Sequence, residues 1–232
     1  GGAAASGYDI DQSLRFDDGD SAYLSRTPSS AGNLRTWTWS GWVKRGNLTV
    51  WQVPFSAGRS SPEDRTEISF ESADTIRIFQ KDGGSTAMSL VTTQVFRDSS
   101  AWYHLVVAMD TTQATDTNRV KLYVNGSQVT VFGTTTYPTQ NLDTWVNSTA
   151  VPTTIGTDSR LYSADFDGYL AEVHFIDGTA LGPESFGETD AATNQWKPIN
   201  VTGLTYGTNG FYQKYSSTEL ADSFTDSSSR TV

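Results

Sequence analysis

The 232-residue sequence contains no cysteine and two histidines. Disulfide bonds and thiolate ligands are therefore excluded, and His104 and His174 lack the His-x-His or His-x-x-x-His spacing of zinc sites. A secreted eukaryotic domain usually carries disulfides, so their absence favours synthesis in a reducing cytoplasm, including that of a protein later carried outside by assembly or lysis. A chain of this length can bury a core that folds without such crosslinks.

Positive charge is also scarce. Lys and Arg number 16 against 26 Asp and Glu, which gives a net charge of −10, and the basic residues are scattered along the chain. Such a chain lacks the basic patch that binds nucleic acids or anionic membranes. The sequence also shows no signal-peptide pattern and no apolar run of membrane-spanning length, so we expect neither nucleic-acid binding nor membrane insertion.

Residues 102–131 carry the clearest secondary-structure pattern. Residues 102–109 are apolar on both alternating faces, as expected of a strand buried between two layers, and residues 119–124 alternate apolar with polar side chains. Asn125 and Gly126 supply the two positive-φ positions of a tight turn into residues 127–131. The stretch predicts a three-stranded antiparallel meander.

Short strand patterns recur along the chain, separated by turn residues. They occupy residues 13–26 (two strands around an acidic turn), 36–45, 50–57, 66–72, 75–80, 87–92 and 169–176. We expect Trp37 and Trp39, which share one face of their strand, in the core rather than exposed as a platform for sugar rings. Residues 132–149 are expected to form a long polar loop. Many short strands without a helical period predict an all-β sandwich or barrel.

Several segments together resemble the laminin-G-like domains of the concanavalin A-like lectin/glucanase superfamily. Residues 102–126 read Trp-Tyr-His, an apolar strand, Asp, a polar loop and Lys-Leu-Tyr-Val-Asn-Gly, and residues 36–44 read Thr-Trp-Thr-Trp-Ser-Gly-Trp-Val-Lys. Ile-Gly at 155, Phe-Asp-Gly with an apolar strand at 166–176, and Ala-Leu-Gly-Pro-Glu-Ser-Phe at 180–186 follow in the family's order. The resemblance implies a two-layer antiparallel β-sandwich, a concanavalin A-like jelly roll.

The resemblance covers about residues 13–186, and the expected organisation follows from it. Residues 1–12 look like a linker, residues 13–186 form the laminin-G-like sandwich, residues 187–215 form an extension that packs on it with a short hairpin, and residues 216–232 form a polar connector or tail. The linker-like start suggests a processed product or part of a longer protein. The run through residues 187–212 resembles laminin-G-like domains in tail, fibre and capsid-appendage proteins of marine bacteriophages.

Two groups of carboxylates are candidate Ca²⁺ ligands. Asp17, Asp18 and Asp20 crowd one turn, and carboxylate oxygens suit this hard cation. Their spacing matches no complete calcium loop, so the sequence favours the alternative of a solvated hairpin tip. The resemblance implies that calcium, where present, sits on a rim of the sandwich, which points to the second group. That group is Asp158, Asp165 and Asp167. We expect no cofactor to be required.

Aromatic residues in loops are the candidates for glycan contact, because loops on a rigid scaffold carry recognition. They are Tyr137, Trp145 and Tyr162, with Arg160 beside the last. The alternative for Trp145 is that its ring pins the loop to the sandwich.

No catalytic constellation emerges, since the chain has no nucleophile elbow, no phosphate loop and no carboxylate pair at glycosidase spacing around Glu63, Glu67 and Glu71. We expect a non-catalytic structural and adhesive module of a phage virion, with other virion proteins or further copies of itself as partners and host-surface polysaccharide as ligand. The alternative is a carbohydrate-binding module or glycoside hydrolase domain of a secreted bacterial protein. A eukaryotic adhesion domain is a third hypothesis, suggested by Asn-x-Ser/Thr sequons.

Overall fold

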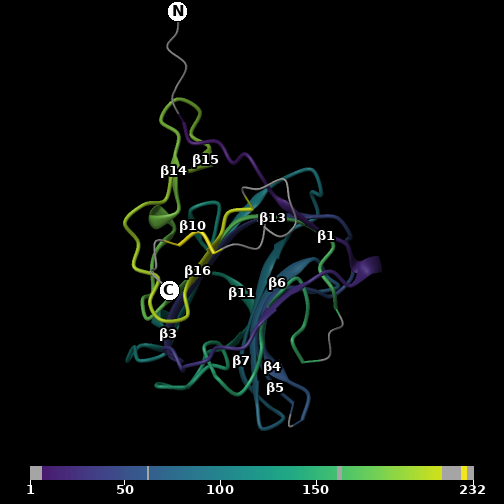
Figure 1. The fold of residues 1–232 in the computed structure, drawn as a ribbon, viewed down its shortest axis with the longest axis vertical. Helices are drawn as coiled ribbons and strands as arrows, with labels where there is room; N and C mark the ends of the chain where they lie inside the picture. Colours follow the sequence, from purple (N-terminus) through teal and green to yellow (C-terminus); the bar gives the residue numbers. More distant parts are fainter. Residues whose placement is uncertain (1–6, 62, 161–163, 216–225, 229–232) are drawn as a thin grey trace, which may run out of the picture.

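The computed structural model describes residues 7–61, 63–160, 164–215 and 226–228. Its strands form two large antiparallel sheets that pack face to face (Figure 1). The two-layer β-sandwich expected from the sequence is confirmed. No helix among the described residues is long and apolar enough to cross a membrane.

Sheet A contains the long central strands that the sequence pattern identified. In spatial order its strands are β1 (Leu14–Phe16), β13 (Gly168–Asp177), β3 (Thr36–Arg45), β8 (Tyr103–Asp110), β9 (Val120–Val124) and β10 (Ser127–Gln128). A further strand, β16 (Phe211–Gln213), pairs with β13 beyond β1, so that β1 and β16 both lie along the side of β13 that faces away from β3. The predicted meander is β8-β9-β10, and the turn between β9 and β10 has φ values of 47° at Asn125 and 79° at Gly126.

Sheet B contains four consecutive strands that are joined by short turns. In spatial order its strands are β11 (Phe132–Thr136), β7 (Ser85–Val95), β6 (Thr75–Asp82), β5 (Asp64–Phe70), β4 (Gln52–Arg59), β12 (Thr153–Ile155) and β2 (Leu24–Arg26), and β4 to β7 are the four consecutive ones. A separate two-stranded ribbon joins β14 (Gly187–Thr189) to β15 (Trp196–Pro198). Three 3₁₀ turns complete the described elements: η1 (Asp18–Asp20), η2 (Asp116–Asn118) and η3 (Pro183–Ser185).

Two sequence-based expectations about local structure are wrong. The strands around the acidic turn do not form a hairpin, because β1 pairs with β13 in sheet A and β2 with β12 in sheet B. The acidic turn is therefore a crossover between the sheets. The expected loop at 132–149 begins with strand β11 at the edge of sheet B, which was missed because its Gly-Thr-Thr-Thr sequence lacks apolar alternation.

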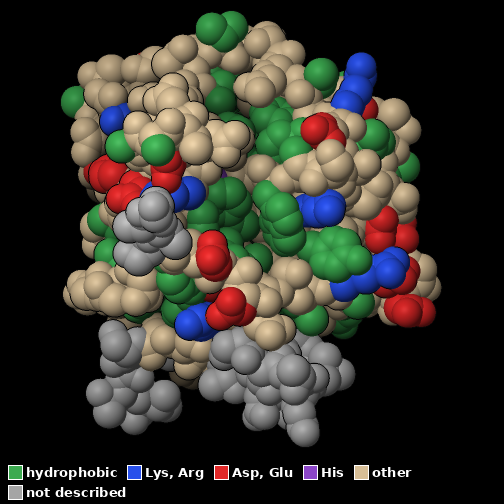
Figure 2. Space-filling view, turned by 90° about the horizontal axis from the view of Figure 1, so that it is seen from above, with side chains coloured by type: hydrophobic (Ala, Val, Ile, Leu, Met, Phe, Trp, Pro, Cys, Tyr) green, Lys and Arg blue, Asp and Glu red, His purple; other side chains and the backbone are tan. Residues whose placement is uncertain are grey.

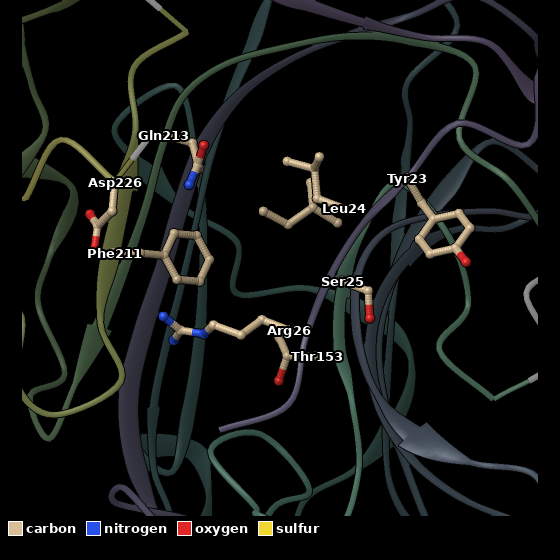
Figure 3. A pocket seen from close by; sticks show the side chains of 9 residues that line it. Tyr23, Leu24, Ser25, Arg26, Thr153, Phe211, Gln213 and Asp226 are labelled. Atoms are coloured by element: carbon tan, nitrogen blue, oxygen red, sulfur yellow. The ribbon is translucent and has the colours of Figure 1, made fainter. Parts of the chain in front are cut away.

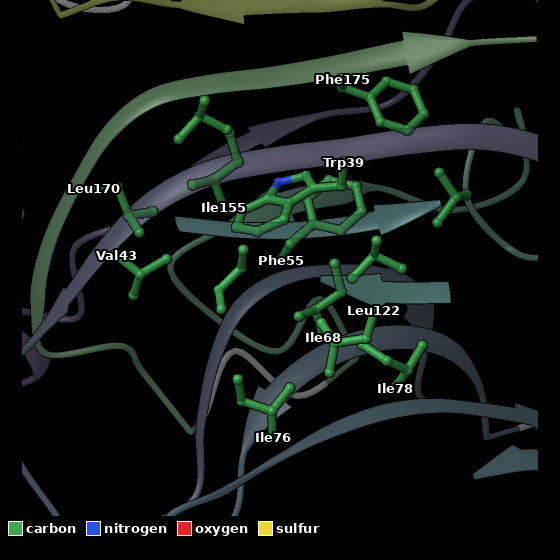
Figure 4. Packing of buried hydrophobic residues seen from close by; sticks show 14 of the residues in the cluster. Trp39, Val43, Phe55, Ile68, Ile76, Ile78, Leu122, Ile155, Leu170 and Phe175 are labelled. Carbon is green, nitrogen blue, oxygen red and sulfur yellow. The ribbon is translucent and has the colours of Figure 1, made fainter. Parts of the chain in front are cut away.

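The core between the sheets is aromatic and aliphatic (Figure 4). Trp37 and Trp39 are fully buried in it, as predicted. The ring of Phe55, from sheet B, lies 5.9 Å from that of Trp39 and 5.8 Å from that of Phe175, both from sheet A. Each large ring buried at this interface stabilises the fold by several kcal/mol, to judge from the cost of about 3–5 kcal/mol for truncating such a ring to alanine.

The outer face of each sheet, the face turned away from the core, is also largely covered. Sheet A carries a second apolar cluster of Val106, Ile176, Phe186, Tyr206 and Tyr212. This cluster binds the segment after β13 onto the sheet, which explains how a stretch with little regular structure stays in place.

Candidate functional site

The pairing of β1 with β13 builds an acidic cluster at one rim of the sandwich. Phe16 lies opposite Gly168 in this antiparallel pair. Asp17 follows Phe16 and Asp167 precedes Gly168, so the two aspartates come together at the same end of the pair. Asp18 joins them, and one carboxylate oxygen of each of the three residues lies within 4.8 Å of the others. The cluster takes two members from the first predicted group and one from the second.

The carboxylates of this cluster are positioned by their neighbours. Asp17 accepts a hydrogen bond from the backbone of Gly19 at 3.0 Å and lies 3.1 Å from the Arg15 guanidinium, and Asn47 donates to Asp18 at 2.9 Å. The pKa of Asp167 is raised, mainly by burial and then by repulsion from Asp18.

The loop beside the cluster approaches closely because it contains Gly46. The Gly46 backbone donates to the Asp167 carbonyl at 2.8 Å, and a Cβ at position 46 would lie 2.1 Å from the Asp167 carboxylate. A side chain there would displace the carboxylate, so glycine keeps Asp167 beside its acidic neighbours.

The spacing of the three carboxylates fits a calcium ion. Oxygens bind Ca²⁺ at about 2.3–2.6 Å, so two ligands of one ion lie no more than about 5 Å apart. The three oxygens satisfy this limit. A cation at their centre would also oppose the charge repulsion that raises the pKa of Asp167.

The other predicted metal ligands lie elsewhere. Asp20 belongs to the same turn but is not part of the acidic cluster. Asp158 is buried and pairs with Arg160 at 3.1 Å, and Asp165 accepts a hydrogen bond from the Thr157 hydroxyl at 2.5 Å. These two carboxylates therefore hold their own loop together.

Trp145 occupies a fixed position beside sheet B. Its indole N–H donates to the Lys81 carbonyl at 3.1 Å, its backbone N–H donates to the Thr66 hydroxyl at 3.0 Å, and the Arg59 guanidinium lies 4.9 Å from its ring centre. This geometry matches the alternative in which the ring pins its loop. The half-buried ring lies under a cation rather than forming an open platform.

Arg160 belongs to the same charged region as Trp145. Its guanidinium pairs with Glu63 at 2.7 Å and with Asp158, and Glu63 also accepts from Lys81 at 2.8 Å. Lys81 thus connects the two predicted residues through its carbonyl and its ammonium group. Tyr137 lies apart, after β11, where burial raises its pKa, and Tyr162 lies outside the described residues.

The carboxylates of strand β5 are engaged in ion pairs. Glu67 is fully buried, and its two oxygens accept hydrogen bonds from Arg65 (2.8 Å) and from Arg77. The Arg77 Nε also lies 3.0 Å from Glu71. Because guanidinium groups occupy both oxygens of Glu67, this side chain is a structural anion and is not presented to a glycosidic bond.

Sequence reasoning missed a groove between the edge strand β2 and strand β16 (Figure 3). Its volume is about 500 Å³, and its walls include Leu24, Arg26 and Phe211. The Arg26 guanidinium lies 5.5 Å from the ring centre of Phe211 and donates to the Asn209 carbonyl. The two walls lie more than 180 residues apart in sequence, so no local pattern could have joined them.

Comparison with known proteins adds to this geometry. A family model, Laminin_G_3, described as the concanavalin A-like lectin/glucanases superfamily, matches residues 17–185. A search among curated protein sequences gave no match.

Solved structures with this fold share little sequence with the chain. A mutant NanB sialidase from Streptococcus pneumoniae is similar with a TM-score of 0.53 at 14% identity over 77% of this chain and 28% of that one. The full-length tailspike protein 2 of Escherichia coli O157:H7 bacteriophage CAB120 gives 0.50 at 12% identity, over 75% of this chain and 23% of that one. A heptameric SAP-like pentraxin from Limulus polyphemus gives 0.49 at 14% identity, over 82% and 84%. At these identities the likeness concerns the fold alone.

Proposed function

Because the chain belongs to the laminin-G-like family of the concanavalin A-like lectin/glucanases superfamily, we propose that it is a non-catalytic carbohydrate-binding module that uses Ca²⁺. The observation that carries the proposal is the meeting of Asp17, Asp18 and Asp167 at a loop-bearing rim of the sandwich. These three side chains would hold the cation. When bound, Ca²⁺ supplies a hard Lewis acid that coordinates vicinal sugar hydroxyls.

The chain's own residues prepare this site. Arg15 and Asn47 orient two of the carboxylates, and the close approach at Gly46 holds the third. Since the carboxylates are already gathered, little side-chain ordering remains for the binding step.

Calcium titration by calorimetry, with parallel thermal unfolding, tests the cation site. We expect binding with a Kd of about 10⁻⁴–10⁻³ M, as for extracellular calcium modules. Asp167→Asn should abolish it, whereas Asp20→Asn, a change in the same turn outside the acidic cluster, should leave it unchanged. Equal binding by both variants would reject the assignment, as would a wild-type protein that ignores millimolar Ca²⁺.

Glycan-array binding in Ca²⁺ and in EGTA tests the carbohydrate ligand. We expect EGTA, which removes Ca²⁺, to reduce the array signal of glycans that bind at the acidic cluster. A protein that retains no glycan in either buffer would overturn the proposed function.

We further propose that the module is displayed on a bacteriophage particle, in repeated copies among other virion proteins, where it contacts host-surface polysaccharide. Support comes from the lack of cysteine, from the resemblance of residues 187–212 to phage appendage proteins and from the shared fold of a phage tailspike. Mass spectrometry and electron microscopy of purified particles test this placement.

A module of a larger secreted bacterial protein is the second candidate. The sandwich shares its fold with part of a sialidase chain, of which it covers 28%. Recovery of the protein from culture medium without particles would favour this candidate, and a repeated knob on a capsid or tail would favour the first.

A further inference from the structure

A shallow groove on the outer face of sheet A shares no residue with the acidic cluster. Its volume is about 320 Å³, at the lower end for small-molecule sites. Its lining comes from the N-terminal segment, from strands β3, β13 and β15, and from the residue before β8: Asp9, Ile10, Asp11, Gln12, Ser13, Trp42, Trp102, Ala171 and Pro198. The end of the molecule that carries β14 and β15 shows apolar side chains gathered at its centre, with charged groups around them (Figure 2).

The aromatic part of the groove is rigid. Trp42 is 8% exposed and stacks on His104, with ring centres 4.8 Å apart. His104 in turn contacts the Ser40 hydroxyl at 2.9 Å and accepts from the Trp196 indole N–H at 2.9 Å. Because these partners come from three separate segments, the Trp42 ring cannot turn without breaking the cluster.

The hollow arises from the register of the strands. Trp42 lies opposite Ala171, a small residue that also lines the groove and is itself 1% exposed. Trp102 stands at the other side, with its ring centre 6.5 Å from that of Tyr169, which is 37% exposed. Two tryptophans thus line the groove, and Trp102 is the more exposed of the two rings.

Polar groups line the remaining wall. Asp9 and Asp11 are exposed and offer carboxylate acceptors, and Gln12 and Ser13 offer donors as well. Among the described residues that line the groove there is no lysine or arginine.

We propose that this groove is a second glycan subsite, selective for uncharged saccharides. The proposal rests on the proposed carbohydrate function. The aliphatic face of a sugar ring packs on Trp102, and its hydroxyls donate to Asp9 and Asp11. An acidic sugar is disfavoured because its carboxylate would lie beside these two carboxylates with no cation in the lining to offset the repulsion.

Calorimetric titration with cellotriose, laminaritriose and mannotriose, and with 3′-sialyllactose as the anionic counterpart, tests the subsite. We expect at least one neutral trisaccharide to bind in EGTA, and Trp102→Ala to weaken it by about tenfold, as for the loss of one aromatic stacking partner. Trp102→Phe, which keeps a flat ring, should recover most of the affinity and guards against a folding defect. Tyr23→Ala is the matched control, because Tyr23 is 42% exposed and lies in the other groove.

The outcomes distinguish a failure of the proposed subsite from a failure of the proposed carbohydrate function. Two results would overturn the proposed subsite while the proposed function stands. One is that Trp102→Ala binds the neutral trisaccharides as well as the wild type does, and the other is that 3′-sialyllactose binds as tightly as they do. Glycan binding that disappears in EGTA or in Asp167→Asn but not in Trp102→Ala would also overturn the subsite while the proposed function stands. Failure of every glycan in either buffer would overturn both.

Discussion

The outer faces of the two sheets are both covered, but by opposite chemistry. Sheet A carries a second apolar cluster that packs against two histidines, whereas sheet B carries a network of ion pairs. An apolar cluster is non-directional, so it can hold an irregular segment through many weak contacts. An ion network is directional, and each member depends on the partner that neutralises it.

In sheet B the network is centred on one carboxylate. Glu67 is 0% exposed, and the two arginines that bind it both lie over the ring of Phe79, with guanidinium distances of 4.7 Å for Arg65 and 4.2 Å for Arg77. The anion and the aromatic ring together replace the water that these cations lose on burial.

The largest expected effect is the loss of this anion. Glu67→Gln keeps the shape of the side chain but leaves Arg65 and Arg77 without their shared charge, so the free energy of unfolding should fall by about 3–5 kcal/mol. Urea unfolding measures it. Glu71→Gln, which removes a more exposed partner of Arg77, should cost under about 1 kcal/mol, and similar losses in the two variants would contradict a network centred on Glu67.

The next expected effect is a pH dependence that comes from sheet A. Burial lowers the pKa of both His104 and His174 from 6.5 to about 3. The unfolded chain therefore binds protons that the native state does not, so stability is greatest above pH 6.5 and declines as pH falls towards 3. At pH 5 the loss is about 2 kcal/mol for each histidine.

Urea unfolding at pH 7 and pH 5 checks this slope. His174→Gln should remove about half of it, because a glutamine does not titrate. The pKa of Glu172 is raised by burial above its ordinary value of 4.5, so this carboxyl adds stability that is complete below pH 4.5 and is lost as pH rises through the raised pKa, which opposes the trend of the histidines. A wild-type protein equally stable at both pH values would show that the histidines accept protons without unfolding.

The smallest of the three expected effects concerns a buried hydroxyl of sheet A. Tyr212 donates a hydrogen bond to Glu172, and Tyr212→Phe should cost about 1–3 kcal/mol because a buried carboxylate loses a donor. Tyr8 donates to the same carboxylate at 3.0 Å but is half-exposed, so Tyr8→Phe should cost less. If thermal unfolding shows that Tyr8→Phe costs more stability than Tyr212→Phe, the buried hydrogen bond of Tyr212 contributes less than its burial implies.

Sequence periodicity predicted what lies within each strand. A period of two placed Trp37 and Trp39 in the core, and the same period put Trp42 and Trp102 on the opposite face. It could not say what covers that face, because the segment after β13 has no regular pattern and meets the strand residues through long-range contacts such as the stack of His104 on Trp196.

The acidic cluster marks a second limit of the sequence. Each predicted carboxylate group was local in sequence, but the cluster joins Asp17 to Asp167 through a strand pair whose members are about 150 residues apart. Only the register of that pair decides which aspartates meet. Tertiary pairing therefore made one site from parts of two predictions and left Asp20, Asp158 and Asp165 outside it.

The register of β13 against β3 shifts between Ala171 and His174, and Glu172 within this bulge links distant parts of the chain. Glu172, at φ 48°, receives one hydroxyl from Tyr8, before the first strand, and one from Tyr212, in the last described strand. A single carboxylate of β13 thus ties the segment before β1 to strand β16, about 200 residues further along the chain. A substitution of Glu172 would therefore loosen two distant segments of the chain at once, because both hydroxyls would lose their shared acceptor.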